Sequence, residues 1–531
     1  MNRDKQKYKW HIKIHREGEK IPSFFASHGI PEELARILMH RGIDSEEKLS
    51  HFLYDNLDHL SDPFLMKGMD KAVSRILQAI DQHEKIVVYG DYDVDGITST
   101  SIMIRCLSSL GADVGYYIPQ REKEGYGLNR EAVNHLAEEG YHLLITVDCG
   151  ISSAALISEA PKGLDIIVTD HHTPPELLPS CVAVLNPHQK DCSYPYKELA
   201  GCGVAYTLCR GLYMKRLGRD YDGTVELAAL GTIADVVSLT GENRILVKEG
   251  MKRFIHTPIK GLAALLKASG IVHDDTTEIR RADQVSFGLA PRLNAAGRIA
   301  RASEGVRLMT TESAEEAERL AQKLCEINTM RQQIERDIFE QAKSRMAELG
   351  IENDMAVVVD GKDWHPGVIG IVASRILESC HRPVFVITVR DGIGKGSCRS
   401  IPAFNIYKAL SAQSDILLQF GGHKMAAGFS IAEEKIPELR RRMNRYAASV
   451  LTEEDCIPVL DVEEELSLKD VSLDFIHSLD LLEPCGADNP KPLFAMNHAF
   501  VETARHMGAD GRHFKCQISG DSGLVDAIFW A

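Results

Sequence analysis

Short apolar runs alternate with helical patterns between about residues 70 and 187. The runs are rich in Val, Ile and Leu, and they lie at residues 85–91, 142–148, 165–172 and 182–187. Stretches such as 98–111 and 129–140 separate them and have the pattern of helices. Runs that are apolar on both faces are typical of parallel strands covered by helices. Ligands of such sheets bind beyond the carboxyl ends of the strands. The pattern therefore predicts an α/β domain with its site at that edge.

A long helix and a second α/β unit are expected further along the chain. Residues 312–349 contain no Gly or Pro, and Gly350 follows as a stop signal, so we expect one helix that links two lobes. From Met355 strands and helices alternate again, with a glycine-rich turn expected at 391–400. From about Pro458 short strands and turns fit the beginning of a small β-barrel. The chain ends at Ala531 directly after a strand-like run, which leaves open that the natural protein continues.

The composition is that of a globular protein without a targeting segment. The 531 residues are 44% hydrophobic and 26% charged, a length that suits about three or four domains. The N-terminus lacks the apolar core of a signal peptide, and the apolar runs are shorter than the ~20 residues of a membrane helix. The 12 cysteines include no CxxC pair, which argues against thiolate metal sites. We therefore expect a cytoplasmic protein with no membrane contact.

The net charge of −15 argues against a protein that coats nucleic acid non-specifically. Phosphate groups would have to bind at local clusters of Lys and Arg or through metal ions. An acidic chain remains compatible with a nuclease, because a site for two cations needs several carboxylates.

Acidic residues and histidines gather where the predicted strands end. They are Asp91, Asp93, Asp95, Asp148, Asp170, His171 and His172, together with Asp235 in a helical stretch. Each of them alone is commonly a turn or capping residue. Four segments that converge on one sheet edge bring like charges together, which is costly unless cations neutralise them.

This donor set suits hard divalent cations. Carboxylates with one or two imidazoles favour Mn²⁺ and Mg²⁺, and two such ions ~4 Å apart can polarise a phosphate and generate hydroxide. The sequence contains no HExxH motif, and residues 392–397 (GIGKGS) lack the spacing of a Walker A loop. We therefore expect phosphoester hydrolysis at a two-metal site.

Eight motifs resemble one known family. Residues 91–95 (DYDVD), 147–150 (VDCG), 169–172 (TDHH) and 231–237 (GTIADVV) are similar, in this order, to the four motifs of DHH phosphoesterases. Residues 291–298 (PRLNAAGR), 365–375 (HPGVIGIVASR), 396–400 (GSCRS) and 421–428 (GGHKMAAG) resemble RecJ proteins and their DHHA1 domain. The resemblance covers about residues 60–531.

The resemblance implies a fold and a domain order. A parallel-sheet DHH catalytic domain is expected at 61–311, a connecting helix at 312–350, and a smaller α/β DHHA1 domain at 351–452. An OB-like β-barrel at 453–531, incomplete if the natural chain is longer, would follow, and residues 1–60 would form an N-terminal segment.

The implied activity is that of a 5′→3′ exonuclease specific for single-stranded DNA. Such an enzyme releases 5′-mononucleotides by two-metal hydrolysis in DNA repair and recombination. The family resemblance also implies two protein partners, a single-stranded-DNA-binding protein and a RecQ-type helicase.

The resemblance assigns roles to the carboxylates and histidines. Asp93 would bind one metal and Asp95 the other, and Asp148 would bridge them. His171 and Asp235 would complete the second site, while Asp91 is a ligand or lies just behind one. His172 would contact the scissile phosphate, and Asp170 would orient a histidine.

Six further residues are candidates for binding the DNA strand. They are Arg121, Arg292, Arg298, Ser397, Arg399 and His423. Guanidinium groups match phosphate oxygens in pairs, and a glycine-rich turn with Ser397 and Arg399 could hold a terminal phosphate. An exposed loop position is the alternative for Arg121. For residues 421–428 a role in helix–helix packing is an equally good interpretation.

Two other functions remain open at this point. Related DHH enzymes cleave short oligoribonucleotides or cyclic dinucleotides, and they are usually shorter chains. A non-catalytic DNA-binding scaffold is the second alternative, although every acidic motif position is present here.

Overall fold

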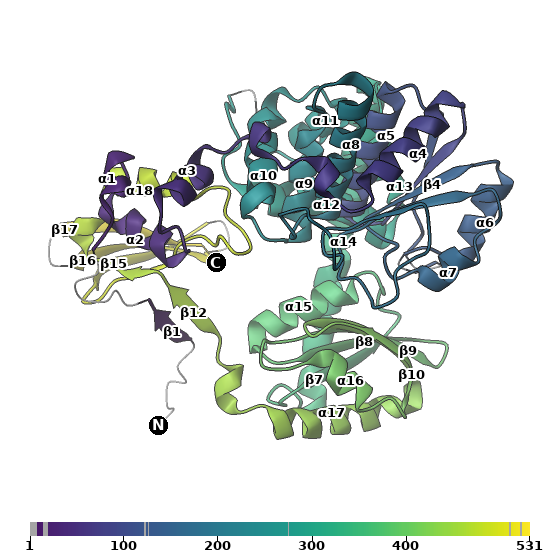
Figure 1. The fold of residues 1–531 in the computed structure, drawn as a ribbon. Helices are drawn as coiled ribbons and strands as arrows, with labels where there is room; N and C mark the ends of the chain where they lie inside the picture. Colours follow the sequence, from purple (N-terminus) through teal and green to yellow (C-terminus); the bar gives the residue numbers. More distant parts are fainter. Residues whose placement is uncertain are drawn as a thin grey trace.

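The chain folds into a large lobe, a smaller α/β lobe and a third lobe that combines N-terminal and C-terminal segments (Figure 1). The computed structural model describes residues 8–13, 20–121, 124–125, 127–273, 275–508, 511–520 and 523–530. No helix in this part of the chain is long and apolar enough to cross a membrane.

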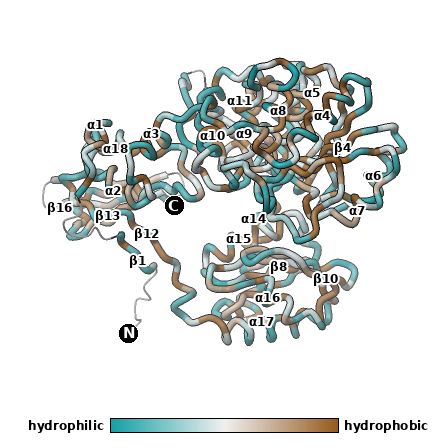
Figure 2. Tube along the Cα trace, in the orientation of Figure 1, coloured by the Kyte–Doolittle hydropathy of each residue, from teal (hydrophilic) through white to brown (hydrophobic). Residues whose placement is uncertain are grey.

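A five-stranded parallel sheet forms the centre of the large lobe. Its strands, in spatial order, are β3 (Val114–Tyr117), β2 (Ile86–Gly90), β4 (Leu143–Val147), β5 (Asp165–Thr169) and β6 (Ala183–Leu185). Both β2 and β4 are buried throughout, and Figure 2 shows the hydrophobic colouring around β4. From β2 the chain continues to β3, which lies on one side of β2, and then to β4, which lies on the other side of β2. The strand order therefore reverses between β2 and β4, where sheets of this kind bind ligands.

Alternate residues of these strands enter two separate cores. Val88 and Ile145 pack on one side of the sheet, while Val87 and Leu144 pack on the other. The helices on the first side include α4 (Met69–Asp81), α5 (Val94–Ser109) and α8 (Gly201–Leu217). Those on the second side are α6 (Arg130–Glu138) and α7 (Ala154–Ser158). The burial of both faces explains why the strands are continuous apolar runs.

Helices complete the large lobe. They are α9 (Val225–Asp235), α10 (Gly241–Arg253), α11 (Lys260–Ala268), α12 (Ala290–Ile299) and α13 (Ser303–Thr310). The predicted connecting helix is confirmed as α14 (Ala314–Leu349), which Ser313 caps at its start and Gly350 ends in a left-handed conformation. Leu320 and Leu324 of α14 pack in the large lobe, and Ala342 and Met346 pack in the small one.

The small lobe contains a mixed five-stranded sheet. Its strands, in spatial order, are β10 (Leu417–Gly422), β11 (Ala426–Ala432), β9 (Ile393–Arg399), β8 (Val384–Arg390) and β7 (Val357–Lys362). Only β7 and β8 are parallel to each other. Its helices are α15 (Ile369–Cys380), α16 (Ile406–Ser411) and α17 (Ile436–Val450).

One prediction for the small lobe was wrong, and one alternative interpretation is excluded. Most of the predicted glycine-rich turn at 391–400 is strand β9, because Gly396 lies directly beneath the Phe429 ring of β11 and leaves no room for a side chain. Residues 421–428 form the turn and flanks of the β10–β11 hairpin, so their glycines do not pack helices together.

The third lobe joins N-terminal and C-terminal segments of the described chain. Strand β1 (Lys9–Ile12) pairs in parallel with β12 (Val459–Val462), and β13 (Glu464–Glu465) pairs with β14 (Phe494–Ala495). The helices α1 (Ser23–Ser27), α2 (Glu32–His40) and α3 (Glu46–Tyr54) share a core with Leu482, beside α18 (Leu473–Leu479). The N-terminal segment therefore packs with the C-terminal region.

The C-terminal β-rich region contains a three-stranded antiparallel sheet in the described part of the chain. Its strands are β15 (Phe500–Met507), β16 (His513–Gly520) and β17 (Gly523–Phe529). Arg244 of α10 links this lobe to the large one, since its guanidinium donates to the carbonyls of residues 481–484 and of Phe52.

Candidate active site

Three carboxylates follow strand β2. Asp91 comes directly after the strand, and Asp93 caps α5 by accepting a hydrogen bond from the Gly96 N–H at 3.0 Å. Asp95 lies in the first turn of α5 and accepts from the N–H groups of Gly201 (2.7 Å) and Cys202 (2.8 Å) at the start of α8. A side chain at Gly201 could not fit, because its Cβ would lie 2.8 Å from Asp148 and 2.9 Å from Asp95. Asp93 and Asp95 are thus held by two helix N-termini.

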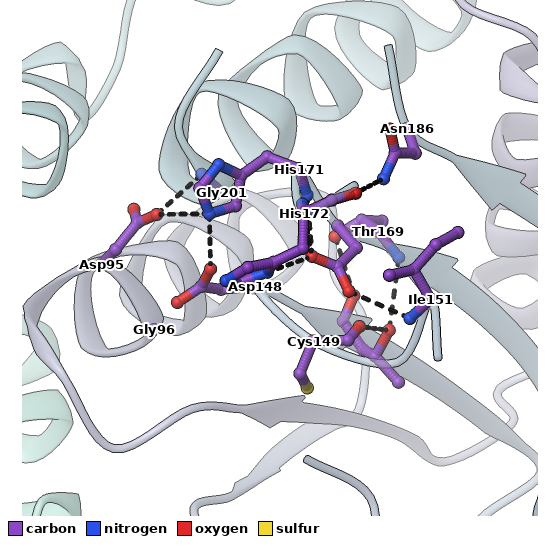
Figure 3. A network of polar contacts seen from close by, with 12 residues as sticks. Asp95, Gly96, Asp148, Cys149, Ile151, Thr169, His171, His172, Asn186 and Gly201 are labelled. Atoms are coloured by element: carbon purple, nitrogen blue, oxygen red, sulfur yellow. Dashed lines mark hydrogen bonds and ion pairs between the residues drawn. The ribbon is translucent and has the colours of Figure 1, made fainter. Parts of the chain in front are cut away.

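Asp148 and His171 join these carboxylates from β4 and β5. The His171 Nε2 atom lies 3.2 Å from Asp148 Oδ1 and 3.9 Å from Asp95 Oδ2 (Figure 3). It also lies 3.6 Å from Asp235 Oδ2. Asp148 has a φ of 59°, a left-handed conformation that Asp tolerates better than most residues. Asp235 is the last residue of α9.

Asp148, His171 and His172 form one group of possible ligands, and two further sets emerge beside it. Asp91, Asp93 and Asp148 form one set, and Asp95, His171 and Asp235 form the other, with the ligand atoms of each set within 4.8 Å of one another. Asp148 and His171 connect the sets through their 3.2 Å contact. The structure therefore brings the ends of four sequence segments to one point.

The electrostatics of this cluster fit divalent cations. Burial, together with the charges of neighbouring carboxylates, raises the pKa of Asp91, Asp93 and Asp148 above the ordinary value for Asp. The same causes raise the pKa of Asp235 to about 8. Within the described residues, Asp91 Oδ1 and His171 Nε2 are buried and take part in no hydrogen bond. Cations would satisfy these atoms and relieve the repulsion between the carboxylates.

His172 and Asp170 form a pair beside the cluster. Asp170 is buried, and its Oδ1 lies 2.7 Å from His172 Nδ1. Its two oxygens also accept from the N–H groups of Ile151, His171 and His172. Burial alone would lower the pKa of His172, but the Asp170 hydrogen bond and charge raise it to about 9. His172 is thus held as a cation at neutral pH, with its side chain 44% exposed.

The sequence reasoning missed Asn186, which supports His172 from behind. Its side chain is fully buried after β6, and its Nδ2 donates to the His172 carbonyl at 2.9 Å (Figure 3). Its Oδ1 accepts from the His188 N–H at 2.8 Å. The one signal in the sequence is a polar residue at the end of a fourth apolar run.

Three predicted arginines approach one another from different elements. Arg121 follows β3, Arg298 lies near the end of α12, and Arg399 ends β9 in the small lobe. Burial and the charges of Arg121, Arg331 and Arg399 lower the pKa of Arg298 to about 10. Burial also lowers the pKa of Arg399, with a further contribution from the charge of Arg121. Guanidinium groups of both lobes are therefore close enough to repel one another.

Contacts around these arginines join the two lobes. Arg298 donates to the carbonyl of Gly367 in the small lobe at 3.3 Å, and Arg399 donates to the Ser397 hydroxyl at 3.4 Å. Arg331 of α14, which the sequence reasoning did not select, is paired with Glu335 at 2.7 Å.

The other two predicted strand-binding residues lie in different settings. The Arg292 guanidinium donates to Cys325 Sγ and to the carbonyls of Gly288 and Ser269. These contacts give Arg292 a packing role in the helical part of the large lobe. His423 is exposed in the turn between β10 and β11, where its N–H donates to the Ala426 carbonyl. Strand binding by either residue stays a prediction.

Comparisons with known proteins support the predicted family. Family models match residues 85–233 (DHH family, N-terminal domain), 353–449 (DHHA1 domain) and 462–531 (RecJ OB domain). The single-stranded-DNA-specific exonuclease RecJ of Bacillus subtilis is 42% identical over 525 residues, which are 98% of this chain and 66% of that protein. The protein of the same name from Thermus thermophilus is 38% identical, over 92% of this chain and 69% of that protein.

The chain belongs to the RecJ family of DHH phosphoesterases. It spans about two thirds of the length of these two relatives. A crystal structure of Thermus thermophilus RecJ in complex with Mn²⁺ superposes with a TM-score of 0.85 at 34% identity, over 99% of this chain and 74% of that one. Its complex with Mg²⁺ gives a TM-score of 0.79. These matches confirm the predicted RecJ fold, with DHH, DHHA1 and OB domains in that order.

Proposed function

We propose that this chain is a single-stranded-DNA-specific exonuclease that uses two divalent cations to hydrolyse the terminal phosphodiester. The observation that carries the proposal is the pair of ligand sets joined by the 3.2 Å contact between Asp148 and His171. The names of the RecJ relatives supply the substrate, and the metal-bound RecJ structures supply the choice of Mn²⁺ or Mg²⁺.

The residues of the cluster have distinct roles in this proposal. Asp93 would hold one cation, Asp95 would hold the other, and Asp148 would bridge the two. His171 and Asp235 would complete the second site, and the free Oδ1 of Asp91 favours a direct ligand role for it in the first. When bound, the two cations would polarise the scissile phosphodiester and activate water for attack.

His172 and Asp170 would act on the substrate side of the site. The exposed imidazolium of His172 can donate to a phosphate oxygen and stabilise the negative charge that develops in the transition state. Asp170 keeps the ring oriented through the 2.7 Å contact to Nδ1 and keeps it charged.

The arginines of both lobes would bind the strand. Arg298 would contact backbone phosphates, and Arg121, Ser397 and Arg399 would gather around the terminal phosphate. The 5′→3′ polarity and the release of 5′-mononucleotides rest on membership of the RecJ family. A cytoplasmic location and a role in repair and recombination rest on the same membership. The two proposed partners, a single-stranded-DNA-binding protein and a RecQ-type helicase, also rest on it.

The substrate proposal predicts a strong preference for single strands. Arg298 of the large lobe contacts Gly367 of the small lobe beside the cluster, so an entering substrate would be bounded by both lobes. Opening two base pairs of a duplex costs ~3 kcal/mol, which lowers the rate roughly 100-fold. Digestion of end-labelled single-stranded and blunt duplex DNA with Mn²⁺ or Mg²⁺ measures this ratio.

Controls for this experiment separate the competing functions. EDTA should stop the reaction, and a ribodinucleotide should be a poor substrate. Equal rates on both DNA forms would contradict entry as a single strand. Faster hydrolysis of the ribodinucleotide or of a cyclic dinucleotide would favour a short-oligonucleotide phosphodiesterase. A metal-loaded protein that binds DNA without cutting it would be a scaffold.

Asn186 offers a second test of the site. Asn186→Ala removes the donor to the His172 carbonyl and the acceptor for the His188 N–H. Loss of such a supporting contact typically lowers activity ~10- to 100-fold. We expect kcat to fall within this range while Mn²⁺ affinity, measured by calorimetry, stays unchanged. The exposed Asn134 of α6 provides the matched control Asn134→Ala. Equal kcat values for the two variants would remove Asn186 from the site.

A further inference from the structure

Tyr92 lies between two of the candidate metal ligands. It occupies the connection from β2 to α5, with Asp91 before it and Asp93 after it. Its ring is half-buried against the core of the large lobe.

The face of this ring contacts Arg121. The guanidinium carbon of Arg121 lies 5.1 Å from the centroid of the Tyr92 ring. Arg121 is itself exposed, and within the described residues no hydrogen bond or ion pair holds its guanidinium. The negative face of a tyrosine ring attracts a guanidinium at this distance. Among the described residues, Tyr92 is therefore a contact that gives Arg121 a preferred position.

The backbone of Tyr92 is held from the opposite direction by α12. Gly297 approaches the Tyr92 carbonyl so closely that a Cβ at this position would collide with it. The next residue is Arg298, which contacts Gly367 of the small lobe. Tyr92 thus lies at the junction of the carboxylate cluster, the Arg121 loop and the helix that carries Arg298.

We infer that Tyr92 is a positioning residue, whose ring holds the Arg121 guanidinium where it meets the terminal phosphate of the bound strand. This inference rests on the proposed function and adds a residue to its end-recognition step. The contact joins recognition of the strand end to the loop that carries Asp91 and Asp93. A terminal phosphate that binds Arg121 is then placed at a defined distance from the carboxylate cluster.

A purely structural role for Tyr92 makes a different prediction. If the ring only filled space beneath the loop, Tyr92→Leu would disturb Asp91 and Asp93 and slow every substrate equally. If the ring positions Arg121, the loss should depend on the end group of the strand. Tyr92→Phe keeps the ring face and should behave like wild type.

The experiment compares Tyr92→Leu, Tyr92→Phe, Arg121→Ala and the double variant Tyr92→Leu/Arg121→Ala. Each is assayed on oligonucleotides that differ only in a 5′-phosphate or a 5′-hydroxyl. Tyr92→Leu should lower kcat/KM for the phosphorylated strand relative to the hydroxyl strand by roughly 3- to 30-fold, the range of a cation–π contact. Tyr92→Phe should stay within about 2-fold of wild type. The double variant should lose no more than Arg121→Ala alone, because both changes remove one interaction.

Two further measurements make the result decisive. Mn²⁺ affinity by calorimetry should be the same in Tyr92→Leu and in the matched control Tyr54→Leu, since Tyr54 is 56% exposed in the third lobe. Equal slowing of both strands, weaker Mn²⁺ binding, or multiplying losses in the double variant would overturn the inference. Fluorescence anisotropy of the same oligonucleotides in EDTA reports end preference without catalysis. A wild-type protein that cuts neither strand would refute the proposed function, while the anisotropy ratio would still decide the role of Tyr92.

Discussion

Asp148→Asn should reduce DNA hydrolysis by roughly 10³-fold or more, because Asp148 belongs to one ligand set and contacts His171 of the other. Asparagine is the appropriate replacement, since it keeps the shape of the side chain and tolerates the φ of 59°. The measurement is single-turnover digestion of single-stranded DNA with saturating Mn²⁺. The control is Asp191→Asn, at a position 84% exposed to solvent. Near-normal turnover of Asp148→Asn would rule out the bridging role.

The same variant should not destabilise the metal-free protein. The pKa of Asp148 is raised in the folded state by burial and by the neighbouring carboxylates. A carboxyl group of this kind contributes stability below its ordinary pKa, and the contribution is lost as the pH rises through the raised pKa. In EDTA, Asp148→Asn should therefore gain stability relative to wild type as the pH rises above the ordinary pKa of Asp, as measured by thermal unfolding. A relative loss over this range would indicate that the Asp148 carboxylate is stabilised by contacts within the protein.

Arg399→Ala should weaken the use of 5′-phosphorylated strands far more than that of 5′-hydroxyl strands. Arg399 is partly buried beside Ser397. Burial lowers the pKa of its guanidinium, and the charge of Arg121 lowers this pKa further. A dianionic phosphate would neutralise this repulsion between guanidinium groups. Loss of a charge-assisted contact costs ~1.5–3 kcal/mol, or roughly 10- to 150-fold in affinity. The ratio of kcat/KM for the two strands measures the effect.

Both strands are assayed on the same protein. A general folding defect would therefore lower both rates equally and would leave their ratio unchanged. Arg390→Ala is the matched control, because Arg390 ends the neighbouring strand β8 and its side chain is 66% exposed. The kcat/KM values of Arg390→Ala for the 5′-phosphorylated and the 5′-hydroxyl strand should both stay close to those of wild type. Equal slowing of both strands by Arg399→Ala would assign Arg399 to the general strand-binding surface or to the scaffold of β9.

Much of the fold could be predicted from local patterns. The buried strands of the large lobe are apolar on both faces, and the absence of Gly and Pro over 312–349 indicated the connecting helix. The carboxylates could also be located, because the carboxyl ends of parallel strands meet at one edge. Their positions Asp91, Asp148 and Asp170 follow β2, β4 and β5 directly. The strands of the small lobe were harder to predict. Gly396 lies in strand β9 beneath the Phe429 ring of β11, and this contact is made by residues far apart in the sequence.

The tertiary structure alone decided which residues meet across long separations. Arg121, Arg298 and Arg399 belong to three elements of two lobes, and their mutual approach depends on how α12 and α14 pack. Arg292 carries the same kind of side chain as Arg298, yet its hydrogen bonds lie within the helical packing. The pairing of β1 with β12 joins residues about 450 positions apart. Periodicity and strand ends follow from each residue and its chain neighbours, whereas these contacts depend on lobe packing, which no local pattern of the sequence encodes.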